Sequence, residues 1–464
     1  MKKNLTFLKG LSLLCLSVLV LAACAPAATP TAAPATEAPA ATEAPAATEA
    51  PAATEAPAAA EPVTLTYLAD DSEVTQSMVH ALADAYMAKN PNVTIEIENR
   101  PQGSDGDNVV KTRLATGDMT DIFFYNSGSL LQALQPSDTL VDLSGQPFLD
   151  NVVESFLPTV TQGNGIYGVP TGTAMGGGIL YNKKIYEDLG LSVPKTWAEF
   201  EANNAAIADS GVAAPVCATF GDTWTSQLFV LADYYNVQAA DPNFAEDYTA
   251  NKAKYATTPA ALAGFQYLQE GYDKNWWEPD YATTTYAQGL DLIATGKCAH
   301  YPMLTFALPT IADNYPDAVN DIGYFGQPGT DASNAGTTIW MPAGTYIAKT
   351  SEHIPEAMDF LAFIASTEGA DALTAAVSPG GPYVIKGATL PNDVLPAVKD
   401  IAAYVDAGKS APALEFLSPI KGPSLEQICV SVATGQMTAE EGAAAYDEDV
   451  KKQAQQLGLP GWGE

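Results

Sequence analysis

The chain has 464 residues, with 54 acidic and 21 basic side chains and a formal net charge of −33. This length exceeds a typical single domain and predicts two lobes of about 150–200 residues each. From Pro62 onward 49 acidic residues stand against 18 basic ones, a net charge of −31, which argues against nucleic acid or an anionic membrane surface as a partner.

A lipoprotein signal peptide is predicted over residues 1–23. Three lysines precede an apolar run from Leu11 to Ala22, which is too short to span a membrane. The small residues before Cys24 are typical of a bacterial lipobox, in which the cysteine is acylated. We therefore expect export and lipid anchoring on the outer face of the cytoplasmic membrane, periplasmic or at the cell surface. A cleaved secretory peptide with an incidental cysteine is the alternative.

Residues 24–61 are predicted to form a disordered tether. The sequence TEAPAA occurs four times between Thr36 and Ala59, and the segment contains no large apolar residue that could build a core. A proline in every repeat excludes a helical rod. The tether would hold the following domain near the membrane surface.

Residues 63–125 alternate between strand and helix patterns. The expected elements are strands at 63–67, 93–98 and 121–125 and helices at 74–89 and 108–116. This order builds a parallel sheet with right-handed crossovers, and ligands bind beyond the carboxyl ends of such strands. The polar loops 70–73, 100–103 and 126–128 are therefore candidate binding loops.

A glycine-rich stretch, residues 165–200, interrupts this pattern. A strand ends at Pro170, Gly176, Gly177 and Gly178 follow, and a second apolar strand covers 179–181. Glycine reaches backbone angles that other residues avoid and permits close approach, so the three glycines are predicted as a hinge between the lobes. Two capped helices come next, the first starting after Asn182 and the second at the capping box of Thr196.

The remaining chain alternates again. The expected helices are 197–210, 225–235, 259–274, 284–295, 355–366 and 367–377, the expected strands are 214–219, 298–303, 321–325 and an interrupted strand at 337–347, and 391–458 is expected to be helical. Second and third crossings are placed at the interrupted strand and at 378–383. The lobes would then comprise 62–173 plus about 326–378, and 179–325 plus about 384–464.

No catalytic or metal-binding motif is found. Cys217, Cys298 and Cys429 lack metal-ligand spacing, and either one disulfide with one free thiol or three buried thiols fits them. The three histidines are scattered, and His300 is interpreted as a core or hinge residue. We therefore expect neither a cofactor nor a metal.

Four segments carry a family resemblance: RLATGDMTDIFFYN (113–126), residues 165–200 with YNK and PKTW, LIATGKCAHYPM (292–303) and SEHIPEAMDFLAFIASTEGADAL (351–373). In this order they resemble the blocks of bacterial extracellular solute-binding proteins of family 1, and most of all the sugar-binding, maltodextrin-binding-protein-like lipoproteins of ABC importers. The resemblance implies an α/β fold of the periplasmic-binding-protein type (type II-like). Each lobe would be a mostly parallel sheet flanked by helices, with three hinge crossings.

The resemblance also implies positions that contact the ligand. It places them at Asp70, Asp71, Tyr125, Asn126, Trp224 and Phe306. Trp340, after a loop of small polar residues, and Tyr383, at the third crossing, are added as further candidates. Aromatic platforms with short polar groups suit the apolar face and hydroxyl rim of a sugar ring. Core packing for Tyr125 and a solvated turn for Asp70 and Asp71 remain open.

We expect a monomeric receptor, not an enzyme, that captures a neutral mono- or oligosaccharide and delivers it to the transmembrane subunits of an ABC permease. Its contact with the membrane would be the lipid anchor alone. A receptor for another small solute such as a polyamine is an alternative, because the acidity favours a cation. A surface glycan-degrading enzyme, which needs two carboxylates across the cleft, is a second alternative.

Overall fold

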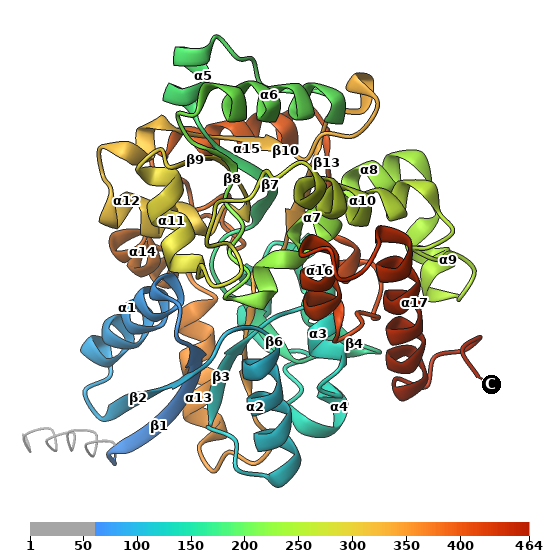
Figure 1. Ribbon diagram of the computed structural model, residues 1–464. Coiled ribbons are helices and arrows are strands. Elements are labelled where there is room, and N and C mark those ends of the chain that lie inside the picture. Colours follow the sequence, from blue (N-terminus) through green and yellow to red (C-terminus); the bar gives the residue numbers. More distant parts are fainter. Residues whose placement is uncertain (1–60, 464) are drawn as a thin grey trace, which may run out of the picture. The chain divides into compact units, whose positions relative to one another are not determined.

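The structure, a computed structural model, describes residues 61–463. The predicted signal peptide, Cys24 and all but the last residue of the predicted tether lie outside the described residues. Two sheets organise the described part, and each defines a lobe (Figure 1). No helix within residues 61–463 combines the length and the apolar character that crossing a membrane requires.

The first lobe is built on a five-stranded sheet of order β2-β1-β3-β12-β6. β1 pairs in parallel with β2 and β3, as the strand–helix alternation predicts, whereas β12 is antiparallel to β3 and to β6. The core beneath α1, α13 and α14 includes Leu82 and Phe360. The elements are β1 (Val63–Asp70), α1 (Glu73–Lys89), β2 (Val93–Arg100), α2 (Gly103–Thr116), β3 (Ile122–Tyr125), α3 (Ser129–Gln132), α4 (Pro136–Thr139), β4 (Thr161–Gln162), β5 (Gly165–Ile166), β6 (Gly168–Pro170), β12 (Gly344–Ile347), α13 (Ile354–Ile364) and α14 (Thr367–Ala376).

The second lobe is built on a six-stranded sheet of order β13-β11-β7-β9-β8, with β10 also paired to β7. β7 is antiparallel to β9, β10 and β11, so this sheet is mixed. The prediction of a mostly parallel sheet is therefore wrong for this lobe. Its elements are β7 (Met175–Asn182), α5 (Lys183–Leu189), α6 (Trp197–Ser210), β8 (Ala214–Val216), α7 (Leu228–Leu231), α8 (Tyr234–Ala240), α9 (Phe244–Thr249), α10 (Pro259–Asp273), α11 (Tyr286–Ala294), β9 (Cys298–Leu304), α12 (Ala307–Asn314), β10 (Ile322–Gly326), β11 (Thr337–Trp340), α15 (Pro396–Asp406), β13 (Ser410–Pro412), α16 (Leu425–Ala433) and α17 (Ala439–Gln456). Short 3-10 helices η3 (Thr223–Gln227) and η6 (Leu414–Phe416) adjoin it.

The three glycines predicted as a hinge lie inside β7, so that prediction is wrong. Gly176 and Gly177 pair with β11, and Gly178 pairs with β9 and β10. A Cβ atom on Gly177 would stand 2.1 Å from a ring carbon of Trp340, so the missing side chain makes room for the indole. The crossing itself falls just before β7, where Gly172 has a φ of +106°.

Sheet membership moves two expected lobe boundaries. β11 belongs to the second sheet and β12 to the first, so the second crossing lies at residues 341–343, inside the interrupted strand where it was predicted, and the lobe boundary expected near 326 moves there. Val384 and Ile385 pack in the core of the first lobe, and Ile385 bridges to Val152. The third crossing therefore follows residue 385, later than the predicted segment 378–383.

Several local predictions also change. α2 begins at Gly103, five residues earlier than expected, and the helix expected at 225–235 is broken into η3, α7 and α8. The C-terminal region includes the strand β13. Cys217 and Cys298 form a disulfide, and Cys429 is a buried free thiol. His300 is a core residue whose pKa burial lowers to about 3.

Candidate functional site

A cavity of about 540 Å³ opens between the two lobes. Its walls are the loops that follow β1, β2 and β3, the crossings after β6 and β11, and segments of the second lobe around η3, α12, η6 and α16. This volume falls within the range of small-molecule sites. The carboxyl ends of the first three strands face it, as expected for an open parallel sheet.

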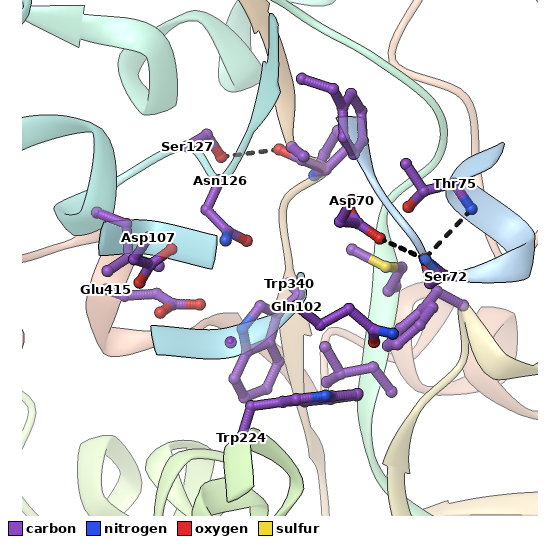
Figure 2. A pocket seen from close by; sticks show the side chains of 18 of the residues that line it. Asp70, Ser72, Thr75, Gln102, Asp107, Asn126, Ser127, Trp224, Trp340 and Glu415 are labelled. Atoms are coloured by element: carbon purple, nitrogen blue, oxygen red, sulfur yellow. Dashed lines mark hydrogen bonds between the residues drawn. The ribbon is translucent and has the colours of Figure 1, made fainter. Parts of the chain in front are cut away.

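The first lobe contributes short polar side chains to the cavity. Ser72 caps α1 and donates hydrogen bonds from its backbone nitrogen and its Oγ to Asp70 Oδ1, at 3.1 and 2.5 Å. These bonds fix the Asp70 carboxylate at the end of β1. Asn126 follows β3 with an exposed side chain, and Ser127 Oγ donates to Pro342 O at 2.7 Å, which ties this loop to the second crossing (Figure 2).

The second lobe contributes an aromatic cluster, which we define as Trp224, Tyr286 and Phe306. The Trp224 ring lies 5.3 Å from Tyr286 and 6.0 Å from Phe306, and the last two stack at 5.6 Å. Trp224 and Phe306 line the cavity, whereas Tyr286 backs them at 5% exposure. Burial raises the pKa of the Tyr286 hydroxyl well above its ordinary value, so the ring stays neutral.

Two hydrogen bonds hold this aromatic cluster in place. Asp222 Oδ2 accepts from the Tyr286 backbone nitrogen at 2.6 Å and joins the start of α11 to the loop before η3. Thr225 Oγ1 donates to Thr219 O at 2.8 Å and fixes η3 on the other side of Trp224. The platform is therefore anchored at both ends.

Trp340 forms another part of the wall. It ends β11, opposite Met175 at the start of β7, and only 6% of it is exposed. Its ring covers Gly177, and its remaining surface faces the cavity.

Six of the eight predicted ligand contacts line the cavity: Asp70, Asn126, Trp224, Phe306, Trp340 and Tyr383. Tyr125 does not, because it is fully buried in the core with Phe123 and Tyr346. Asp71 does not either; it is exposed and accepts a hydrogen bond from Gln102 Nε2 at 3.2 Å. Tyr125 is therefore a core residue, and Asp71 belongs to a solvated turn; both were the alternatives to ligand contact that the sequence left open.

Contacts between the lobes were missed by sequence reasoning. Glu426 Oε2 accepts from Ser104 Oγ of the first lobe at 3.2 Å and from Thr223 Oγ1 of the second lobe at 2.7 Å. Asn314 Nδ2 donates to Glu73 Oε2 across the lobes at 3.3 Å. Because these residues are up to 322 positions apart, no local pattern in the sequence marks them.

The charged groups of the cavity are mostly held by protein partners. Arg100, 5% exposed, donates to Pro101 O at 3.0 Å and Phe124 O at 3.5 Å, and its guanidinium lies 5.5 Å from the Tyr125 ring. Lys421 lies 3.4 Å from Glu415. Within residues 61–463 no group of three or more His, Cys, Asp or Glu side chains is placed to hold a metal ion. The arrangement suits binding of a polar molecule through aromatic contact and hydrogen bonds.

Comparison with known proteins gives a consistent result. A family model described as "Bacterial extracellular solute-binding protein" matches residues 70–371. A multiple sugar-binding protein of Streptococcus mutans serotype c is 22% identical over 70% of this chain and 76% of its own length. The melibiose/raffinose/stachyose-binding protein MelE of Bacillus subtilis (strain 168) is 25% identical over 68% of this chain and 72% of its own length.

Solved structures show the same fold. A chitin oligosaccharide binding protein superposes with a TM-score of 0.74 at 24% identity, covering 85% of this chain and 99% of its own. The binding protein RafE in complex with raffinose gives a TM-score of 0.68 at 21% identity, with 85% and 99% coverage. At these identities the likeness establishes the two-lobed α/β architecture.

Proposed function

This chain belongs to the family of bacterial extracellular solute-binding proteins, and from that premise we propose that it is the carbohydrate receptor of an ABC importer. The neutral sugar would enter the cavity between the lobes, and the loaded receptor would deliver it to the permease. The observation that carries the proposal is the aromatic cluster of Trp224, Tyr286 and Phe306 facing the polar loop ends at Asp70 and Asn126.

The chemistry of a sugar matches both the aromatic side and the polar side of the cavity. A pyranose has an apolar C–H face, which a Trp or Phe ring covers, and a rim of hydroxyl groups. A carboxylate such as Asp70 accepts a stronger hydrogen bond from a hydroxyl than a neutral acceptor does, and Asn126 both donates and accepts. The names of MelE, RafE and the multiple sugar-binding protein support the same ligand class.

Ligand contacts are proposed at the six cavity-lining residues Asp70, Asn126, Trp224, Phe306, Trp340 and Tyr383. Tyr383 contributes its ring, because its hydroxyl is hydrogen-bonded to Thr374 Oγ1. Binding would favour the closed arrangement, in which Ser104 and Glu426 meet.

The proposed location is the outer face of the cytoplasmic membrane, where an acylated Cys24 would hold the receptor as a monomer within reach of its permease. Cys24→Ala, expressed in a bacterium that processes lipoproteins, is expected to move the protein from the membrane fraction to the soluble exported fraction. Membrane association that survives this substitution would rule out the anchor.

A thermal-shift screen of mono- and oligosaccharides, polyamines and amino acids tests the ligand class. A ligand that binds only the native state raises the unfolding midpoint as its concentration rises. At least one neutral sugar is expected to do so. A shift with polyamines and with no sugar would refute the proposal, and release of reducing sugar from an oligosaccharide would show an enzyme.

A further inference from the structure

The two ends of the cavity differ in chemistry. Asp107, Asn126 and Glu415 gather at one end, which we call the polar end, and Asp70, Ser72 and Thr75 lie on the opposite side (Figure 2). Trp224 and Trp340 lie between them. Both sides thus carry polar groups, and what distinguishes the second side is the apolar surface around Ser72 and Thr75.

Apolar side chains also line the cavity, and they include residues of α1, on which Thr75 lies, and of the elements that pack against α1. We define the apolar end by six residues of the cavity lining: Val74, Met78, Leu304, Pro309, Leu373 and Val377. Val74 and Met78 are one turn apart on α1 and form an i, i+4 pair, whereas Leu373 lies in the last turn of α14 and Val377 directly follows that helix with an extended backbone. Pro309, in the first turn of α12, adds the second lobe.

Three sets of contacts join the elements around the apolar end. α1 packs against α14 and approaches α12. Met78 reaches the first crossing, where its Cε would stand 3.0 Å from a Cβ atom on Gly172. The hydrogen bond from Asn314 to Glu73 joins α12 to the start of α1. The apolar surface is thus a built feature shared by both lobes.

A sugar hydroxyl placed here would give up its hydrogen bonds to water and find aliphatic side chains in return. A methyl group placed here would leave water and contact those side chains. Thr75, next to Val74, brings one hydroxyl group to the same end. This hydroxyl could donate a hydrogen bond to an amide or ester oxygen beside the methyl group.

We propose that the apolar end receives a methyl-bearing substituent of the carbohydrate, as in an acetamido sugar, an O-acetylated sugar or a 6-deoxy sugar. The unsubstituted hydroxyl groups of the same ligand lie toward Asp70, Asn126 and the polar end. This inference rests on the proposed function and specifies its ligand class: the receptor prefers a sugar with a buried methyl group to the matched sugar without one.

Calorimetric titration with matched pairs tests the preference. The pairs are N,N′-diacetylchitobiose against cellobiose, L-rhamnose against L-mannose, and a 6-O-acetylated against an unmodified disaccharide. In at least one pair the methyl-bearing sugar is expected to bind about tenfold tighter, and the pair that responds distinguishes acetamido, deoxy and ester chemistry.

The outcomes separate this inference from the proposed function. If the unmodified member binds as tightly as its partner or tighter in every pair, the inference fails and the carbohydrate receptor stands. If polyamines bind and no sugar does, both fail together.

Variants on α1 localise the effect. Met78→Thr is expected to lower the affinity for the methyl-bearing sugar more than the affinity for the unmodified sugar and so to remove the preference, and Met78→Leu is expected to retain it. Met87→Thr is the matched control, because Met87 is on the same helix and is absent from the cavity lining. A preference that Met78→Thr leaves intact, or that Met87→Thr removes equally, would place the methyl group elsewhere and overturn the assignment.

Discussion

The two walls of the cavity are made in different ways. The first lobe supplies Asp70 and Asn126, single polar residues that directly follow β1 and β3. The second lobe supplies the aromatic cluster, whose members come from η3, the start of α11 and the residue before α12, up to 82 positions apart in the chain. One wall depends on where strands end, and the other depends on tertiary packing.

This difference has a functional consequence. The aromatic cluster is backed by the large core of the second lobe and anchored by Asp222 and Thr225, so it is a rigid platform. The polar residues of the first lobe lie on loops and contribute hydrogen bonds one at a time. We therefore expect the second wall to supply most of the affinity and the first wall to supply smaller, additive parts.

Trp224→Ala is expected to have the largest effect. Truncating a central tryptophan in a binding site costs about 2 kcal/mol or more, which is about a 30-fold loss of affinity. Calorimetric titration with the best sugar measures the loss, and Trp224→Phe is expected to restore part of it. Unchanged affinity with an unchanged unfolding midpoint would remove Trp224 from the site.

Gly177→Ala tests whether the glycines of β7 are packing positions. The added methyl group would collide with the Trp340 ring, and overpacking of this kind costs about 1–3 kcal/mol of unfolding free energy. Gly463→Ala is the control, since nothing lies within 4 Å of a Cβ at that position. Equal stability of the two variants would contradict the packing role.

Asp233→Asn tests the interior of the second lobe. Burial raises the pKa of Asp233 to about 8, although Asn236 donates a hydrogen bond to its Oδ1 at 2.8 Å. The unfolded carboxyl ionises near pH 3.8, so the native state is penalised increasingly from about pH 4 to pH 8. The midpoint of the Asn variant, relative to wild type, should therefore rise over this range in a pH series of thermal melts. A constant difference would show that the carboxyl is ionised in the native protein.

Asn126→Ala probes the first wall. Loss of one hydrogen bond to a sugar hydroxyl costs about 1 kcal/mol, or about fivefold in affinity. Titration of this variant beside Trp224→Ala ranks the two walls directly. A loss larger than that of Trp224→Ala would reverse the ranking.

Ser104→Ala is expected to have the smallest effect. It removes the hydrogen bond to Glu426 between the lobes, which should lower affinity about twofold, or about 0.5 kcal/mol, by disfavouring the closed arrangement. Thr223→Ala removes a hydrogen bond to the same carboxylate within one lobe and serves as the control. Small-angle scattering with and without sugar reports closure, and identical closure in wild type and Ser104→Ala would exclude a role for this contact.

The difference between the walls also explains what the sequence could predict. Strand–helix alternation located β1 and β3 and, through them, Asp70 and Asn126. It could not show that Asn126 lines the cavity whereas Tyr125 is buried in the core. The direction in which these consecutive side chains point depends on the packing of Tyr346 and Phe123 beneath the sheet. Tyr286 and Glu426 were missed for the same reason, since their partners lie far away in the chain.

The glycines of β7 were wrongly predicted as a hinge, because a run of glycines is compatible both with a hinge and with close packing of a neighbouring side chain. Only the pairing of β7 with β11, which brings Trp340 over Gly177, decides between them. The strand pairing that moves the lobe boundary from about 326 to residues 341–343 is equally non-local.

Hydrogen–deuterium exchange with and without the best-binding sugar tests the central claim most directly, because it reports both walls in one measurement. Slower exchange is predicted in residues 70–75 and 126–128 of the first lobe and in 223–228 of the second, with little change around α6 and α10. Protection confined to one lobe, or located away from the cavity, would contradict a receptor that holds its sugar between the two walls.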